Sequence, residues 1–191
     1  MIIEDMKKIK KEENPDIIIV SLHWGDEYIS IPHPENVKIG RNLIDEGANL
    51  IIGHHSHVIA PIEKYKNSFI IYSLGNFVFD MSYPLTNYGL LIDIIIPNKN
   101  NEYILKPHII EIQENWIPKI IKLDFEKLIY TSRKIDNITK NINQYYNILS
   151  INRKNYRKSF YILLIRNLLK NPYYIIPFLL RMIKVRRYKF N

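Results

Sequence analysis

Two short apolar runs, residues 16–22 and 48–52, constrain the fold more than any other feature of this sequence. Each run has the length of a strand, and unbroken apolar character is typical of a strand buried on both faces. Residues 2–13 and 34–46 have helical patterns, and Gly47 is placed to end the second helix. Helices that alternate with buried strands predict parallel strand pairing and an α/β architecture.

The region between residues 58 and 113 has a different texture, with shorter apolar stretches separated by turn residues. Strands are expected there at residues 58–65, 69–72, 88–96 and 102–113. Closely spaced strands favour an antiparallel part that follows the parallel one. From residue 124 onward the pattern is helical. The predicted fold class is therefore α/β (α+β), with sheets flanked by helices.

Histidines stand at the ends of both apolar runs. His23 follows the first run, and His54, His55 and His57 follow Gly53 after the second. The carboxyl ends of parallel strands share one edge of a sheet, where ligands bind in open α/β folds. Neutral imidazole is the commonest metal-ligating side chain. We predict that these histidines converge on one site; the alternative is a polar loop whose histidines are solvated or hydrogen-bonded.

The histidine loop separates into two sets of side chains. In an extended segment His55 and His57 lie on one side and suit metal ligands, while His54 points the other way. His54 is therefore the candidate catalytic residue that contacts a substrate; the alternative is that it has no role in the site. Glu27 is a candidate ligand-binding residue, with a solvated loop carboxylate as the alternative. His33, between two prolines, is expected to be exposed, and a structural role is expected for the sixth histidine, His108.

Charge divides the chain into two parts. Residues 1–114 hold 10 Lys and Arg against 16 Asp and Glu, whereas residues 115–191 hold 17 against 3. This asymmetry predicts an acidic globular domain over 1–114 and a basic, largely helical extension over 115–191. The chain has no cysteine, which excludes disulfides and thiolate–metal sites.

The extension ends in two apolar, aromatic segments interrupted by basic residues, 160–170 and 173–184. Neither reaches the ~18–20 apolar residues of a spanning helix. A pair of basic helices within residues 155–190 is predicted to bind an anionic membrane surface, with a helical cap on the globular part as the alternative. No nucleic-acid partner is expected, because no such motif is present. Without a signal peptide or a clear transmembrane helix, a cytoplasmic or membrane-peripheral location is expected.

Three blocks of this sequence resemble the bacterial capsule-synthesis family (CapA/PgsA-like, poly-γ-glutamate synthesis). Residues 18–28 contain the run His-Trp-Gly-Asp-Glu-Tyr, residues 43–58 contain Gly-His-His-Ser-His, and residues 71–80 contain Ser-Leu-Gly-Asn-Phe. The blocks occur in the order that the family has. The resemblance covers roughly residues 1–97 and does not extend to the basic part.

The resemblance implies a calcineurin-like metallophosphoesterase fold, in which a β-sandwich flanked by helices presents a dinuclear metal site. A strand-end histidine and a later His-x-His supply ligands in that fold, and these map onto His23, His55 and His57. The implied cofactor is a divalent metal ion that activates water for attack on a phosphoryl or amide centre. Asn76 is implied as a further ligand-binding or loop-positioning residue; forming a turn with Gly75 is the alternative.

The departure from the family pattern concerns its first half. Family members carry an early aspartate motif, an Asn-Leu-Glu segment and an Asn-Asn-His segment before the block that matches residues 18–28. This sequence shows none of them, so we expect a truncated or split gene product, or one that pairs with a separately encoded N-terminal half. Three histidines without a bridging carboxylate suit at most a single zinc-like ion, and the missing half would leave a sheet edge uncovered.

Two functional hypotheses follow. The first is a metal-dependent, hydrolase-like protein of capsule or poly-γ-glutamate biosynthesis that works once its missing half is supplied, with an anionic polymer as substrate. The second is a non-catalytic, membrane-associated accessory in cell-surface polymer assembly. The sequence fits either an enzyme or a non-catalytic protein.

Overall fold

The helices and strands of the computed structural model begin as alternating helix–strand units and continue as hairpins. The structure describes residues 2–79, 81, 83–95, 104–113, 116–122, 126–170, 173 and 177. The elements are α1 (Ile2–Glu12), β1 (Ile19–His23), α2 (Pro34–Asp45), β2 (Leu50–His54), β3 (Ile62–Tyr65), β4 (Ser68–Ile71), η1 (Pro84–Asn87), β5 (Tyr88–Ile95), β6 (Ile104–Ile112), β7 (Pro118–Ile121), η3 (Glu126–Leu128), β8 (Ile129–Thr131), α3 (Ser132–Thr139) and α4 (Ile142–Lys170).

A five-stranded mixed sheet, in the order β1-β2-β4-β3-β8, forms the centre of the fold. Strands β1, β2 and β4 are parallel, with His23 opposite His54 in the register of β1 and β2. Strand β3 pairs antiparallel with β4 and parallel with β8. The predicted α/β class and the parallel pairing of the two apolar runs are confirmed.

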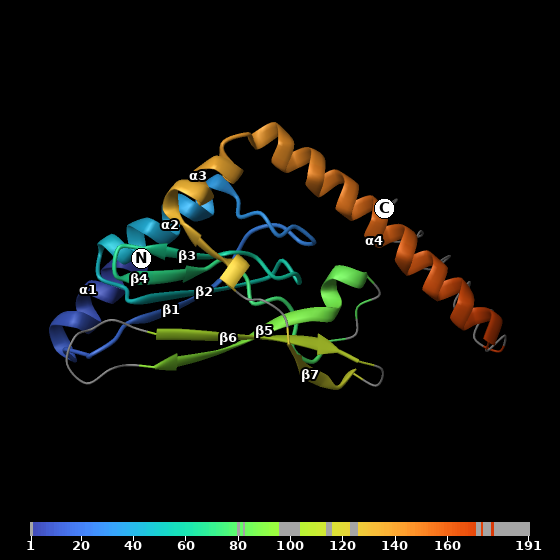
Figure 1. Ribbon diagram of the computed structural model, residues 1–191, viewed down its shortest axis with the longest axis horizontal. Helices are drawn as coiled ribbons and strands as arrows, with labels where there is room; N and C mark the ends of the chain where they lie inside the picture. The colour runs from blue at the N-terminus through green and yellow to red at the C-terminus, as the bar shows by residue number, and fades with distance from the viewer. Residues whose placement is uncertain are drawn as a thin grey trace, which may run out of the picture.

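The central sheet lies between a helical layer and a second, three-stranded antiparallel sheet, β5-β6-β7 (Figure 1). Met6 of α1, Leu43 of α2 and Ile135 of α3 pack on the helical side. On the other side, Ile62 and Ile71 belong to a separate buried cluster whose second-sheet members are Leu90, Leu105 and Ile109. The arrangement is a two-sheet sandwich with helices on one outer face.

Two strand predictions were wrong. Strand β1 is not buried on both faces, because it is the edge strand of its sheet and Ile19 is 46% exposed. The expected strand at 58–65 is reduced to β3, since Ile59 makes only an isolated bridge to Leu74. The strands expected at 69–72, 88–96 and 102–113 are confirmed as β4, β5 and β6, except for residues 96, 102 and 103, which lie outside the described residues.

The prediction of an entirely helical pattern from residue 124 was also wrong, because β8 precedes the helices. Strand β8 pairs with β3 and so joins the central sheet, and Ile135 of the following helix α3 is completely buried in the core. The sequence signal for β8 was weak because this strand is only three residues long and is defined by its pairing with a distant strand rather than by a periodic pattern.

A buried charge network ties the helical layer to the sheet. Glu63 of β3 is fully buried, and the Arg41 guanidinium of α2 lies 2.8 Å from its carboxylate. The same guanidinium lies 2.8 Å from Asp136 of α3. The Tyr72 hydroxyl donates to the other Glu63 oxygen at 2.5 Å. Burial, reinforced by Glu63, raises the pKa of Tyr72, so that hydroxyl remains a donor.

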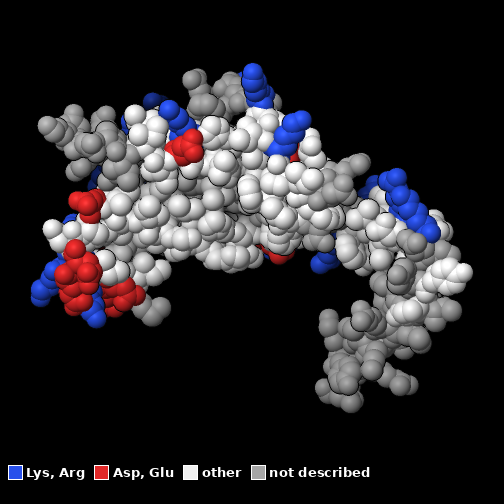
Figure 2. Space-filling view, turned by 90° about the horizontal axis from the view of Figure 1, so that it is seen from below, with Lys and Arg blue, Asp and Glu red and all other residues white. Residues whose placement is uncertain are grey.

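Helix α4 has a packed first half and a projecting second half. Tyr145 and Leu149 are buried against Ile29 of the loop after β1, whereas the far end runs outward from the body as a single rod (Figure 1). In Figure 2 this end forms an arm whose visible charged side chains are basic. The second predicted tail helix, 173–184, lies almost wholly outside the described residues. None of the helices in the described part of the chain combines the length and apolarity needed to cross a bilayer.

Candidate functional site

Three loops meet at the carboxyl edge of the parallel strands. They are residues 24–28 after β1, residues 55–57 after β2 and residues 73–76 after β4. Backbone hydrogen bonds hold them together: Tyr28 N–H donates to the Ser56 carbonyl at 2.8 Å, and Leu74 N–H donates at 3.1 Å to the carbonyl of Gly53, in β2 just before the second loop. The loops therefore form one connected surface at the edge where the sequence predicts a site.

The histidines of this surface lie side by side. The ring centroids of His23 and His55 are 4.4 Å apart, and those of His55 and His57 are 6.4 Å apart. The His57 Nδ1 atom is 2.9 Å from the Asn76 Oδ1 atom. The structure thus brings His23, His55 and His57 together and places Asn76, the candidate ligand-binding or loop-positioning residue, where it orients the third ring.

A metal ion is the cofactor that these residues suggest, and imidazole nitrogen suits a zinc-like ion. Across the described ranges, however, no group of three or more His, Asp or Glu side chains has an arrangement that holds a metal. Two imidazoles are adjacent, while the third is held by Asn76. By themselves the described residues therefore do not form a complete set of metal ligands.

Strained backbone accompanies the histidines. His55 has φ 101°, His57 has φ 60° and Tyr28 has φ 66°, all in the left-handed region. Residues that carry a Cβ atom rarely adopt this region, and those that do concentrate at functional sites. Gly25 and Gly75, in the adjoining loops, also have positive φ. The surroundings must therefore impose the backbone conformations of Tyr28, His55 and His57, whereas the two glycines adopt positive φ readily.

Gly53 of β2 explains how Trp24, in the first loop, packs so closely against Tyr72, which precedes the third loop. A Cβ atom built on Gly53 would lie 2.2 Å from the Tyr72 carbonyl oxygen and 2.4 Å from the Trp24 Nε1 atom. The Trp24 indole N–H donates to the Tyr72 carbonyl oxygen at 3.0 Å, so the indole crosses β2 at Gly53. A glycine is required here because an indole and a backbone carbonyl occupy the space of a side chain. This packing fixes the residue that follows His23.

The remaining predicted residues have different environments. His54 is half-buried, and burial together with the nearby His23 lowers its pKa, which favours the neutral ring. His33 is half-buried rather than exposed, because α4 packs on it, and its ring accepts the Glu35 N–H at the start of α2. His108 lies 3.0 Å from Asp93 on the second sheet, which fits a structural role.

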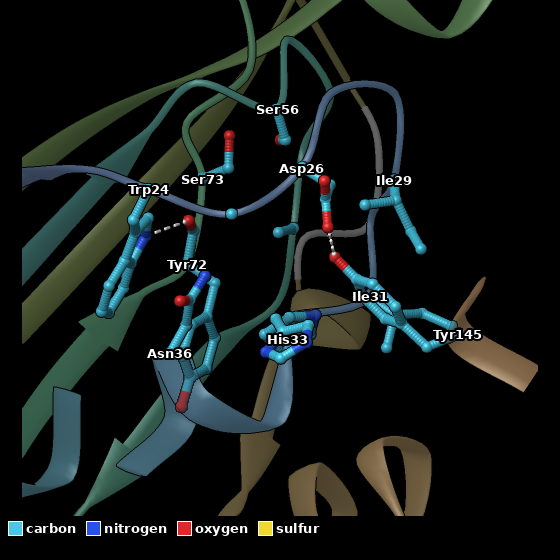
Figure 3. A pocket seen from close by; sticks show the side chains of 13 residues that line it. Trp24, Asp26, Ile29, Ile31, His33, Asn36, Ser56, Tyr72, Ser73 and Tyr145 are labelled. Carbon is cyan, nitrogen blue, oxygen red and sulfur yellow. Dashed lines mark hydrogen bonds between the residues drawn. The ribbon is translucent and has the colours of Figure 1, made fainter. Parts of the chain in front are cut away.

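The loop after β1 also encloses a small cavity of about 20 Å³, lined in part by Trp24, Asp26, His33 and Tyr145 (Figure 3). The Tyr145 hydroxyl donates to Asp26 at 2.9 Å across it. Burial and Asp26 raise the pKa of Tyr145. The cavity has room for about one water molecule and no more, so it is part of the packing of α4.

Sequence reasoning missed the contribution of α4 to the site. Tyr156 stacks on Tyr28 with ring centroids 4.2 Å apart, and Tyr28 in turn lies 6.4 Å from the His57 ring. The Asn152 side chain donates to the Tyr28 carbonyl at 2.7 Å. The only available signal was the helical pattern of the segment, which does not reveal what it packs on.

Comparisons with known proteins point to one family. The family described as "Bacterial capsule synthesis protein PGA_cap" matches residues 1–81, which include all three site loops. The chain is 31% identical over 156 residues to the "Capsule biosynthesis protein CapA" of Bacillus anthracis, covering 75% of this chain and 38% of the relative. It is 43% identical over 81 residues to the "PGA biosynthesis protein CapA" of Bacillus subtilis, covering 42% and 21%.

A third relative is the "Probable polyglutamine synthesis accessory protein Rv0574c" of Mycobacterium tuberculosis, 42% identical over 65 residues, or 34% of this chain and 17% of the relative. This chain therefore spans 38% or less of the length of these three relatives.

Proposed function

This chain belongs, through residues 1–81, to the bacterial capsule synthesis protein family, and from that premise we propose that it acts in the biosynthesis of a capsule polymer of the poly-γ-glutamate kind. The observation that carries the proposal is the gathering of His23, His55 and His57 at one sheet edge, inside the matched region. The finer proposal is a metal-dependent hydrolytic role.

The proposed metal site draws ligands from two sources. His23 and His55, whose rings are adjacent, would hold part of a divalent ion's coordination sphere, and Asn76 fixes the orientation of His57. The remaining ligands, including a carboxylate, would come from a segment that carries the family motifs not found in residues 1–191. Such an ion supplies Lewis acidity for hydrolysis when bound. This chain's own part is to place imidazoles on a strained, glycine-supported edge.

The edge of the central sheet supports the need for a further segment. Strand β1 is an edge strand of the central sheet, so the backbone groups on its outer side have no strand neighbour among the residues described here. Its side chains are exposed or half-buried, with Ile19 46% exposed. Uncovered edges of this kind favour pairing with another strand. We propose that the segment carrying the remaining ligands pairs next to His23, at the end of β1.

Hydrolysis of a short γ-linked glutamate oligomer tests this function. We expect activity when the chain is combined with a polypeptide that carries the family's aspartate, Asn-Leu-Glu and Asn-Asn-His motifs, and none with either alone. His23→Ala should lower the rate by about 100-fold or more, because removing a ligand costs more than the 10–100-fold of an outer-sphere change. His108→Ala is the matched control and should keep full activity. Equal rates in the His23→Ala and His108→Ala variants would contradict the proposal.

A second candidate function, a membrane-associated accessory, is favoured by the far half of α4. Ile162, Ile165 and Leu169 are 57%, 56% and 75% exposed, and Arg166 and Lys170 lie among them. From residue 151 onward the chain has 11 basic residues and no acidic one. Exposed apolar side chains beside basic ones suit an anionic lipid surface, where aliphatic groups insert and cations meet headgroups.

Sedimentation with lipid vesicles tests the second candidate. We expect the chain to bind vesicles that contain phosphatidylglycerol and to leave neutral phosphatidylcholine vesicles unbound, with weaker binding at high salt. The double change Arg166→Glu with Lys170→Glu should lower the affinity by about tenfold or more. The control double change, Lys8→Glu with Lys11→Glu on α1, should leave it nearly unchanged. Equal binding to both kinds of vesicle would rule out this candidate.

A further inference from the structure

An open cleft of about 310 Å³ lies between α4 and the loop that follows β1. Glu27 and Tyr28 line it from the loop, and Arg153, Tyr156 and Arg157 line it from the helix. The helix residues lie outside the region that the capsule synthesis family matches. The cleft is therefore a feature that α4 adds to the family's site.

The cleft adjoins the histidines through one aromatic side chain. Tyr28 is 6% exposed and lies between Tyr156 and His57, at centroid distances of 4.2 Å and 6.4 Å with interplanar angles of 14° and 25°. Asn152 also holds the Tyr28 backbone from the helix. Because the same tyrosine lines the cleft and stacks beside His57, a ligand in the cleft lies next to the histidine loop.

The two arginines of the cleft differ in their ion pairs. The Arg153 guanidinium lies 3.1 Å from Asp26, whose carboxylate partly neutralises its charge. Arg157 is exposed, one helical turn further on the same face, and makes no ion pair with any residue in the part of the chain that the structure describes. Helix α4 contains six Lys and Arg and no Asp or Glu. A guanidinium with no partner, on the wall of a cleft, is a binding group for an oxyanion.

We propose that this cleft binds a carboxylate-bearing polyamide chain, with a carboxylate on Arg157. This inference rests on the proposed function and names the ligand class of the same site. A guanidinium binds a carboxylate through two parallel N–H donors. Glu27 would repel a ligand that is purely anionic, but it accepts the N–H of an amide. A chain that carries both carboxylates and amide N–H groups can bind both walls, and the half-buried Tyr156 ring offers an apolar surface to its methylene groups.

Fluorescence anisotropy with a labelled γ-linked glutamate oligomer tests the inference, using the full chain without added metal. We expect saturable binding, weakened about tenfold by Arg157→Gln, since one charge-assisted hydrogen-bonding pair is lost. Lys154→Gln is the matched control, because Lys154 is exposed on the same helix and lies outside the lining of the cleft. It should change the affinity by less than about twofold. Arg157→Lys should fall between wild type and Arg157→Gln, since the charge remains and the bidentate geometry is lost.

Two further ligands test which chemical groups the cleft recognises. A γ-linked glutamine oligomer has the same backbone without carboxylates and should bind at least about tenfold more weakly. Inorganic tripolyphosphate that bound as tightly, with the same dependence on Arg157, would overturn the polyamide assignment. Equal losses in Arg157→Gln and Lys154→Gln would show diffuse attraction to α4 and would also overturn it, as would the absence of saturable binding. The assay contains neither metal nor the completing segment, so its failure is distinct from failure of the hydrolytic role.

Discussion

Replacing Arg41 by methionine is expected to destabilise the fold by about 3–5 kcal/mol, the cost of leaving a buried charge without its partner. Glu63 has no exposed surface, and Arg41 joins it to Asp136, so the change removes the link between α2, β3 and α3. The Tyr72 hydroxyl would remain as a partner of the carboxylate. Urea unfolding followed by circular dichroism measures the loss.

The control for this prediction is Lys38→Met on the same helix. Lys38 makes an exposed ion pair with Glu35, and such pairs contribute little to stability because water and salt screen them. Adding Glu63→Gln to Arg41→Met should recover part of the lost stability, since the buried charge is then removed. Equal unfolding midpoints for Arg41→Met and Lys38→Met would show that the network does not stabilise the fold.

Gly53→Ala is expected to cost about 3 kcal/mol, at the upper end of the usual range for overpacking. The added methyl group would lie 2.2 Å from the Tyr72 carbonyl oxygen, and a backbone atom cannot move aside as a flexible side chain does. The Trp24 indole must then shift and lose its hydrogen bond to that carbonyl. A red shift of Trp24 emission, measured in a Trp116→Phe background, should accompany the loss of stability.

Gly40→Ala provides the contrast. A Cβ on Gly40 would meet side-chain atoms of Ile70 and Trp24 at 3.2 Å, which small movements relieve, and alanine favours a helix. We expect a much smaller change in stability and no shift in emission. Similar losses for Gly53→Ala and Gly40→Ala would show that the tight approach of Trp24 to Tyr72 is not what requires a glycine in β2.

The first half of the fold follows from local patterns in the sequence. The two apolar runs, the helices around them and Gly47 have periods and end signals that depend on near neighbours only. The gathering of His23, His55 and His57 was predictable for the same reason, because parallel pairing of β1 with β2 places the strand ends together. The rings' roles in a metal site remain predictions.

The remaining features of the fold and of the site depend on contacts between residues that are distant in the sequence. Nothing near Ile19 shows that β1 is an edge strand, since that depends on which strands pair beside it. The stacking of Tyr156 on Tyr28 joins segments that no local pattern relates. Likewise, Arg41 and Glu63 read as ordinary surface charges until the packing of α2 on the sheet buries them.

We propose that the histidine edge holds part of a divalent metal site. Elemental analysis of the chain, purified together with the polypeptide that carries the complementary family motifs, tests it most directly. We predict a bound divalent metal in this preparation, retained in His108→Ala and reduced in His55→Ala to the level of the chain purified alone. An unchanged metal stoichiometry in His55→Ala would contradict the claim.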